Sequence, residues 1–202
     1  MPTLPIPTRF NFKTMNITMV ADGLSTSAIN VSIFSELGAA KSSFQVPQIA
    51  VVDFGKYNAT IVLDRRMAVV SDATGEASIA SPIPEMMSQI IAATPNIRIE
   101  GIGFNYNYEL LVDGAALVLT ERFLRKERFA ILGDLQSAGV KVVCKNDHVI
   151  TLSVDPVWEQ TSVLNIALNH HFAGPDSAPV LARFKDLTLE TPDLLKKVMN
   201  GA

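Results

Sequence analysis

Strict alternation of apolar and polar residues in 97–112 constrains the fold more than any other feature of the sequence. Large apolar side chains occupy every second position from Ile102 to Leu110, and small or polar side chains occupy the positions between them. A period of two residues is that of a β-strand with one buried face and one solvated face. Antiparallel sheets commonly leave one face in water, so this segment predicts a long strand of such a sheet.

Shorter segments with strand-like patterns occur on both sides of this one. They are bounded by residues that favour tight turns, such as Asp22-Gly23, Asp113-Gly114, Lys145-Asn146-Asp147 and Asp155-Pro156. The last three strands are predicted to form an antiparallel meander. The predicted strands are residues 10–20, 48–54, 57–63, 67–70, 140–144, 149–154 and 163–172.

Helical spacing is found in three other segments. Residues 83–93 begin with Ile-Pro-Glu, and residues 115–138 place four apolar side chains seven, seven and four positions apart, on one helical face. Thr191-Pro192-Asp193 is typical of a helix start, with Thr191 as cap and Pro192 in the first turn, which predicts a helix to about Asn200. Residues 26–40 fit a helix or a strand, and we expect a helix.

These elements predict an α+β fold with a mostly antiparallel sheet and three to four helices packed on one face. Regular strand–helix alternation, which a doubly wound parallel fold requires, is missing from the sequence. The proline-rich residues 1–9 predict an extended N-terminal arm, and residues 10–202 predict a single domain.

The composition is apolar and sparsely charged. Hydrophobic residues make up 48% of the chain and charged residues 18%, with a formal net charge of −3. This excludes a disordered chain and argues against a nucleic-acid partner, which needs a basic surface. The low charge indicates that another copy or a partner covers part of the surface, and we expect a homodimer or other homo-oligomer. The alternative is a neutral surface rich in Ser, Thr and Asn.

The sequence also bears on compartment. It holds no apolar run of the roughly 18–20 residues that a membrane-spanning helix needs, and its opening residues lack a signal-peptide pattern. The single cysteine, Cys144, cannot form an internal disulfide. We therefore expect a cytoplasmic protein without a membrane partner. Cys144 shares one side of its predicted strand with Val140 and Val142, which predicts a buried thiol.

Catalytic and cofactor motifs are absent from the sequence. It has no Gly-x-Ser-x-Gly, His-Glu-x-x-His or phosphate-binding loop. Asp53-Phe54-Gly55 and Gly101-Ile102-Gly103 lack the companion residues that would give them a kinase or dinucleotide-binding meaning. The neighbouring His170 and His171 point to opposite faces of a strand, so we expect no metal there, and His170 is predicted to be half-buried and bonded to a neighbour. We expect no cofactor.

Polar residues gather on the predicted solvated face of two strands. Asparagine is disfavoured in strands, so its repeated use at alternate positions indicates a polar role. This face is either a lining for a small polar ligand or the plain wet side of a sheet. The candidate ligand-binding residues are Asn105, Asn107, Glu109, Asn165, Asn169 and His171.

Two functions remain compatible with these patterns. The first is a non-catalytic α+β module that binds another protein or a copy of itself, with Trp158 as an interface anchor. Trp158 is equally compatible with a lid over the core. The second function is a small-molecule binder or enzyme that uses the asparagine-bearing face.

Overall fold

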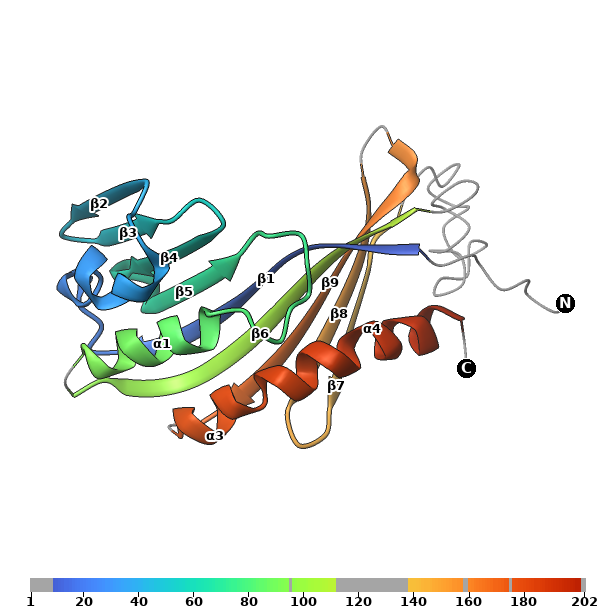
Figure 1. Ribbon diagram of the computed structural model, residues 1–202. Helices are drawn as coiled ribbons and strands as arrows, with labels where there is room; N and C mark the ends of the chain where they lie inside the picture. The colour runs from blue at the N-terminus through green and yellow to red at the C-terminus, as the bar shows by residue number, and fades with distance from the viewer. Residues whose placement is uncertain (1–8, 95, 112–137, 158–159, 175, 201–202) are drawn as a thin grey trace, which may run out of the picture.

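The protein folds around one long antiparallel sheet (Figure 1). The computed structural model describes residues 9–94, 96–111, 138–157, 160–174 and 176–200. Within these residues, nine strands follow the order β2-β3-β4-β5-β1-β6-β9-β8-β7. The strands are β1 (Arg9–Asp22), β2 (Ser42–Val46), β3 (Ile49–Asp53), β4 (Tyr57–Val62), β5 (Met67–Asp72), β6 (Arg98–Leu111), β7 (Val140–Lys145), β8 (Val149–Val157) and β9 (Gln160–Ala173).

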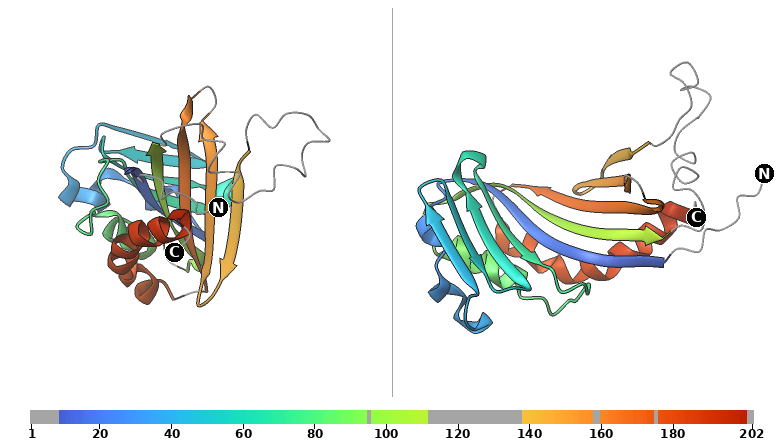
Figure 2. Two further views of the ribbon diagram at one scale, coloured as in Figure 1. Left: turned by 90° about the vertical axis from the view of Figure 1, so that its right-hand side faces the viewer. Right: turned by 90° about the horizontal axis from the view of Figure 1, so that it is seen from above.

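The three longest strands occupy the middle of the sheet. β1, β6 and β9 have 14 residues each, and β6 pairs along its length with the other two. Figure 2 shows that these strands curve along their length. The strands at the two ends of the order, β2 and β7, pair on one side only among the described residues.

Three described α-helices lie against the sheet: α1 (Ile83–Ala92), α3 (Ser177–Ala182) and α4 (Phe184–Asn200). α1 contacts β1 and β5, and α3 contacts β6. α4 reaches β6 through a hydrogen bond between the hydroxyls of Thr188 and Tyr106. Figure 1 shows α1 and α4 on the same side of the sheet.

The alternation in β6 matches its burial, which confirms the strand and its two faces. One face of β6 is 0–3% exposed and lies in the core. The neighbouring strands β1 and β9 add apolar side chains to this face. The helices pack over it and cover it from solvent. The buried residues of β6 on this face are Ile102, Phe104, Tyr106, Tyr108 and Leu110.

The antiparallel meander of the last three strands is confirmed, but its second turn was predicted in the wrong place. β8 continues through Asp155 and Pro156 to Val157, where the prediction placed a turn at Asp155-Pro156. Proline lacks the N–H of a ladder hydrogen bond. It is tolerated here because the pairing of β7 with β8 extends only to Val154.

The C-terminal helix also begins earlier than predicted. Residues 184–200 form one helix with Pro192 inside it, so Thr191 is not a cap. Its hydroxyl instead donates to the carbonyl oxygen of Leu187 at 2.6 Å. Burial explains the difference, because a stripe of side chains at helical spacing faces the sheet and outweighs the missing hydrogen bond. The stripe consists of Phe184, Leu187, Thr188, Thr191, Leu195 and Met199.

Residues 26–40 form neither an α-helix nor a strand. They contain two 3₁₀ helices, Thr26–Ala28 and Val31–Leu37. The Asn30 side chain caps the second one by accepting from the backbone N–H groups of Ser32 and Ile33. The predicted helix over 115–138 and most of the predicted arm over 1–9 lie outside the described residues.

No helix in the described parts of the chain combines the length and the apolar character needed to cross a membrane.

Candidate functional site

The polar face of the central strands carries a row of hydrogen-bonded amides. Asn105 on β6 lies opposite Asn169 on β9 and Asn16 on β1. Its Nδ2 donates to Oδ1 of Asn16 at 2.7 Å, and its Oδ1 accepts from Nδ2 of Asn169. We call Asn16, Asn105 and Asn169 the amide row. It joins three strands across the face that does not carry the helices.

The next two candidate residues on β6, Asn107 and Glu109, bind side chains of β1. Nδ2 of Asn107 donates to the hydroxyl of Thr14 at 2.9 Å, and Glu109 forms an ion pair with Lys13 at 2.7 Å. Asn165 lies opposite Glu109 on β9 and is exposed. These contacts place Asn107, Glu109 and Asn165 on the predicted face, beyond the amide row.

A small hollow lies beside the amide row, where two glycines of β6 leave room. A Cβ on Gly101 would lie 2.7 Å from Cε1 of His171, and one on Gly103 would lie 3.0 Å from Nδ2 of Asn169. The side chains of His171 and Asn169 therefore rest directly over glycine backbone. With Asn105 they line a hollow of about 130 Å³. The structure thus brings together three of the six predicted ligand-binding residues.

This hollow is small for a ligand site. Pockets for small molecules usually enclose at least about 300 Å³. Within the row, most amide donors and acceptors are already used between strands, which links β1, β6 and β9. Ligand binding by Asn105, Asn107, Glu109, Asn165, Asn169 and His171 stays a prediction.

A second polar feature lies in the core and was only partly anticipated. His170 is 3% exposed, and its Nδ1 lies 2.9 Å from Nε2 of His148, a residue in the turn between β7 and β8. Nδ1 of His148 lies 2.6 Å from Oδ1 of Asp147, which also binds Arg183 at 2.7 Å. The sequence indicated a bonded His170, but its contact with His148 depends on strand register that no local pattern reveals.

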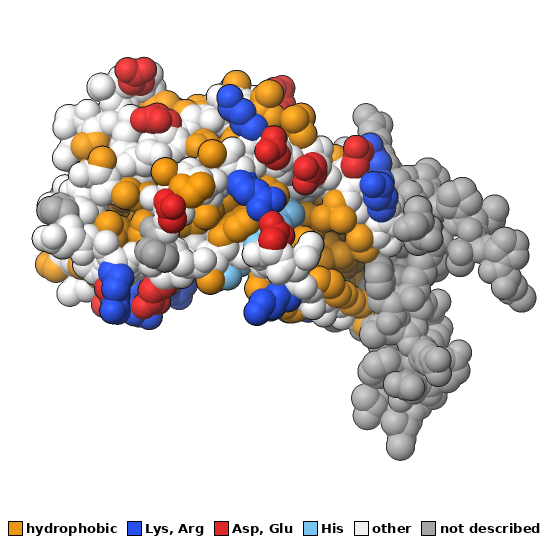
Figure 3. All heavy atoms as spheres, turned by 90° about the horizontal axis from the view of Figure 1, so that it is seen from below, with side chains coloured by type: hydrophobic (Ala, Val, Ile, Leu, Met, Phe, Trp, Pro, Cys, Tyr) orange, Lys and Arg blue, Asp and Glu red, His pale blue; other side chains and the backbone are white. Residues whose placement is uncertain are grey.

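A larger groove separates α1 from α3 and the start of α4. It has a volume of about 410 Å³ and a largely apolar lining, with Ser81, Glu85, Ser88 and Lys185 as polar members. Ser81 donates to the buried carboxylate of Asp72 at 2.6 Å. Figure 3 shows the face that carries the helices, where hydrophobic side chains are interspersed with charged ones. No histidine or cysteine lies among the residues that line this groove.

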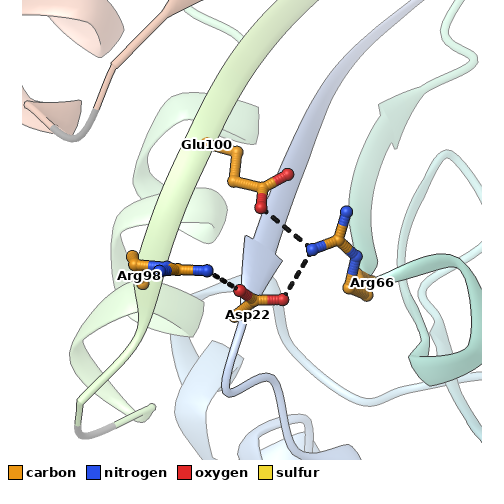
Figure 4. A network of polar contacts seen from close by, with 4 residues as sticks. All are labelled: Asp22, Arg66, Arg98 and Glu100. Atoms are coloured by element: carbon orange, nitrogen blue, oxygen red, sulfur yellow. Dashed lines mark hydrogen bonds and ion pairs between the residues drawn. The ribbon is translucent and has the colours of Figure 1, made fainter.

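Four charged side chains form an exposed cluster where β1 and β6 meet β5 (Figure 4). Arg66 contacts Asp22 at 2.7 Å and Glu100 at 2.9 Å, and Arg98 contacts the other oxygen of Asp22. Hydrogen bonds from Arg66, and then from Arg98, lower the pKa of Asp22. The charges balance within the cluster, so it ties strands together and leaves no unpaired charge for a substrate.

The outer strand β7 is the most exposed apolar segment of the sheet. Every side chain from Lys141 to Lys145 is exposed, with Val142 at 38% and Val143 at 60%. The prediction of a buried Cys144 is wrong, because this edge strand is open to solvent on both faces and the thiol is exposed. Trp158, the predicted interface anchor, lies outside the described residues.

The described residues contain no group of three or more His, Cys, Asp or Glu side chains able to hold a metal ion. No protein-family model matches the sequence, and no curated protein matches it significantly.

Proposed function

We propose that this chain is a non-catalytic protein-binding module that associates with a second copy of itself by pairing the two β7 strands edge to edge. The exposure of Val142 and Val143 on a strand at the sheet edge carries the proposal. One row of backbone N–H and C=O groups on β7 has no strand partner among the described residues, and such edges are templates for another strand.

The charges on β7 favour one register. Lys141 and Lys145 flank the apolar centre of the strand. An antiparallel pair centred on Val143 would place Lys141 opposite Lys145 of the second copy, and like charges directly opposite are unfavourable. A pair centred on Val142 places Lys141 opposite Val143 and pairs residues 140–144 of both copies. We therefore place the two-fold axis at Val142.

A second copy is the proposed occupant because the whole chain is short of charge. Charged residues make up 18% of the sequence, below the usual quarter, which is typical of a chain that covers apolar surface by association. A two-fold pairing also covers the β7 edges of both copies at once, so the β7 contact itself does not lead to an open fibre.

Substituting Val143→Lys should weaken the dimer roughly 100-fold, because it sets a lysine opposite Lys141 twice in the symmetric interface. Sedimentation of the full chain over a dilution series measures this directly. Phe44→Lys is the matched control, since Phe44 is 57% exposed on β2, the strand at the opposite end of the sheet.

We expect a dimer for the unmodified chain and for Phe44→Lys, and a shift to monomer for Val143→Lys. A monomer across the whole series, down to nanomolar concentration, would refute self-association. Loss of the dimer in Phe44→Lys alone would place the interface on the other edge.

A further inference from the structure

Two buried histidine rings are joined directly where the β7–β8 turn meets α4. His148 is 9% exposed and His170 is 3% exposed, and Nε2 of the first lies 2.9 Å from Nδ1 of the second. At the far end of this pair, Nε2 of His170 lies 3.4 Å from Oγ1 of Thr191 on α4. At the near end, Nδ1 of His148 lies 2.6 Å from Oδ1 of Asp147.

Aromatic rings pack around the pair, and few charged groups face it. The Phe172 ring stacks on His148 with centroids 4.3 Å apart, and the Tyr106 ring stands edge-on to His170. Arg183 binds Asp147 and lies over Phe172, with 5.2 Å from its Cζ to the ring centroid. Asp147 and Arg183 are therefore the charged groups that face the pair among the described residues.

The hydrogen-bond partners along this series of contacts favour one arrangement of the ring protons. Thr191 has one hydroxyl proton, which it donates to the carbonyl oxygen of Leu187 at 2.6 Å. Nε2 of His170 must then be the donor in its contact with Thr191, so Nδ1 of His170 is an acceptor. His148 must donate to that nitrogen through Nε2 and to the carboxylate of Asp147 through Nδ1. Only the charged form of His148 can donate from both nitrogens.

We infer that the folded protein binds one proton at the His148–His170 pair, holds it on His148, and thereby fastens the β7–β8 turn to α4. In the alternative with two neutral rings, Nε2 of His170 faces a hydroxyl oxygen whose proton is already donated elsewhere. A buried polar atom left in that state costs free energy.

Two polar groups that contact the pair, Asp147 and Tyr106, do not exchange protons near neutral pH. Hydrogen bonds from Arg183 and His148 lower the pKa of Asp147 to about 2, and burial raises the pKa of Tyr106 to about 12. Burial, together with the charge of His148, lowers the pKa of His170 to about 4. A proton on His170, added to the one that we place on His148, therefore binds only in acid.

Nitrogen NMR of the full chain with labelled imidazole rings tests this inference without any substitution. The chain has three histidines, and His171 on the polar face of the sheet serves as the internal reference. At pH 7 we expect both nitrogens of His148 to be protonated, with His170 neutral and protonated at Nε2. Neutral rings at both positions, each with one unprotonated nitrogen, would overturn the inference.

A pair of helix variants tests the proton count independently. Thr191→Val removes the hydroxyl that fixes the His170 proton, and at pH 7 it should lower the share of His148 rings that carry protons on both nitrogens, read from the same nitrogen spectra. Thr188→Val is the control, because it removes a buried hydroxyl one turn away that bonds to Tyr106. An equal change in His148 protonation in both variants, or no change in Thr191→Val, would contradict the placement of the proton on His148.

Discussion

Phe104→Ala should lower the free energy of unfolding by about 4 kcal/mol, the largest effect expected of a single substitution. Phe104 is 1% exposed and packs against the rings of Phe172 on β9 and Phe184 on α4. Removing it leaves a cavity at the junction of sheet and helix, where neighbouring rings cannot collapse without losing their own contacts. Denaturant unfolding monitored by circular dichroism measures the loss.

Asn105→Ala is the matched control for this prediction. Asn105 is the next residue along β6 and lies on the opposite face, in the amide row. Its loss removes hydrogen bonds at a half-buried site, so a cost of about 1–2 kcal/mol is expected. Equal losses in the two variants would mean that the two faces of β6 do not differ as described.

Acidification from pH 6.5 to pH 4 should destabilise the protein by about 3 kcal/mol through His170. Burial of the ring is the main reason that its pKa falls from 6.5 to about 4 on folding. Between pH 6.5 and pH 4, His170 is therefore protonated in the unfolded chain and neutral in the folded chain. Stability is lost as the pH falls through this window, at up to about 1.4 kcal/mol per pH unit.

Two substitutions isolate this effect in unfolding experiments at several pH values. His170→Gln should flatten the dependence between pH 6.5 and 4 whatever its effect on absolute stability, whereas His171→Gln should retain it. The carboxylate of Asp147, whose pKa is lowered to about 2, adds a loss only below about pH 4. An unchanged slope in His170→Gln would show that another group titrates in this window.

Much of the sheet could be predicted because its strands follow the period of two. Alternation predicted β6, and the patterns in residues 10–20 and 163–172 predicted the strands that flank it, β1 and β9. The antiparallel arrangement followed from short turns between strands. β2 was missed because it is short, its first four residues are exposed, and Phe44 and Val46 are too few to establish an apolar period.

Errors arose where tertiary contacts outweigh local preference. Pro156 and Pro192 both suggested boundaries, yet each lies inside an element. Pairing with β9 keeps Pro156 within β8, and the buried stripe of α4 keeps Pro192 within the helix. Cys144 was expected in the core because alternation shows that a strand has two sides but not whether either is covered.

In the polar sites, periodicity predicted which face a residue occupies, but not which residue on the next strand it meets. Alternation placed Asn105, Asn169 and His171 on one face, which the structure shows. Alternation could not identify Asn16 as the partner of Asn105, because that pairing depends on the register between β1 and β6. Nor could it bring His148 to His170, which lie 22 positions apart and meet across β8 and β9.

Disulfide cross-linking at β7 tests the proposed self-association most directly. In a Val142→Cys, Cys144→Ser chain, the two new thiols lie opposite each other across the two-fold axis, within the Cα separation of roughly 4.4–6.8 Å that a disulfide needs. In the unmodified chain the two Cys144 residues would lie about 14 Å apart, so it should not cross-link. A Phe44→Cys, Cys144→Ser chain is the control at the opposite edge.

Mild oxidation of dilute protein followed by non-reducing electrophoresis gives the readout. We expect a covalent dimer for the Val142→Cys chain, whereas the Phe44→Cys control and the unmodified chain should remain monomeric on the gel. Cross-linking of the Val142→Cys chain no faster than of the Phe44→Cys control would contradict pairing through β7.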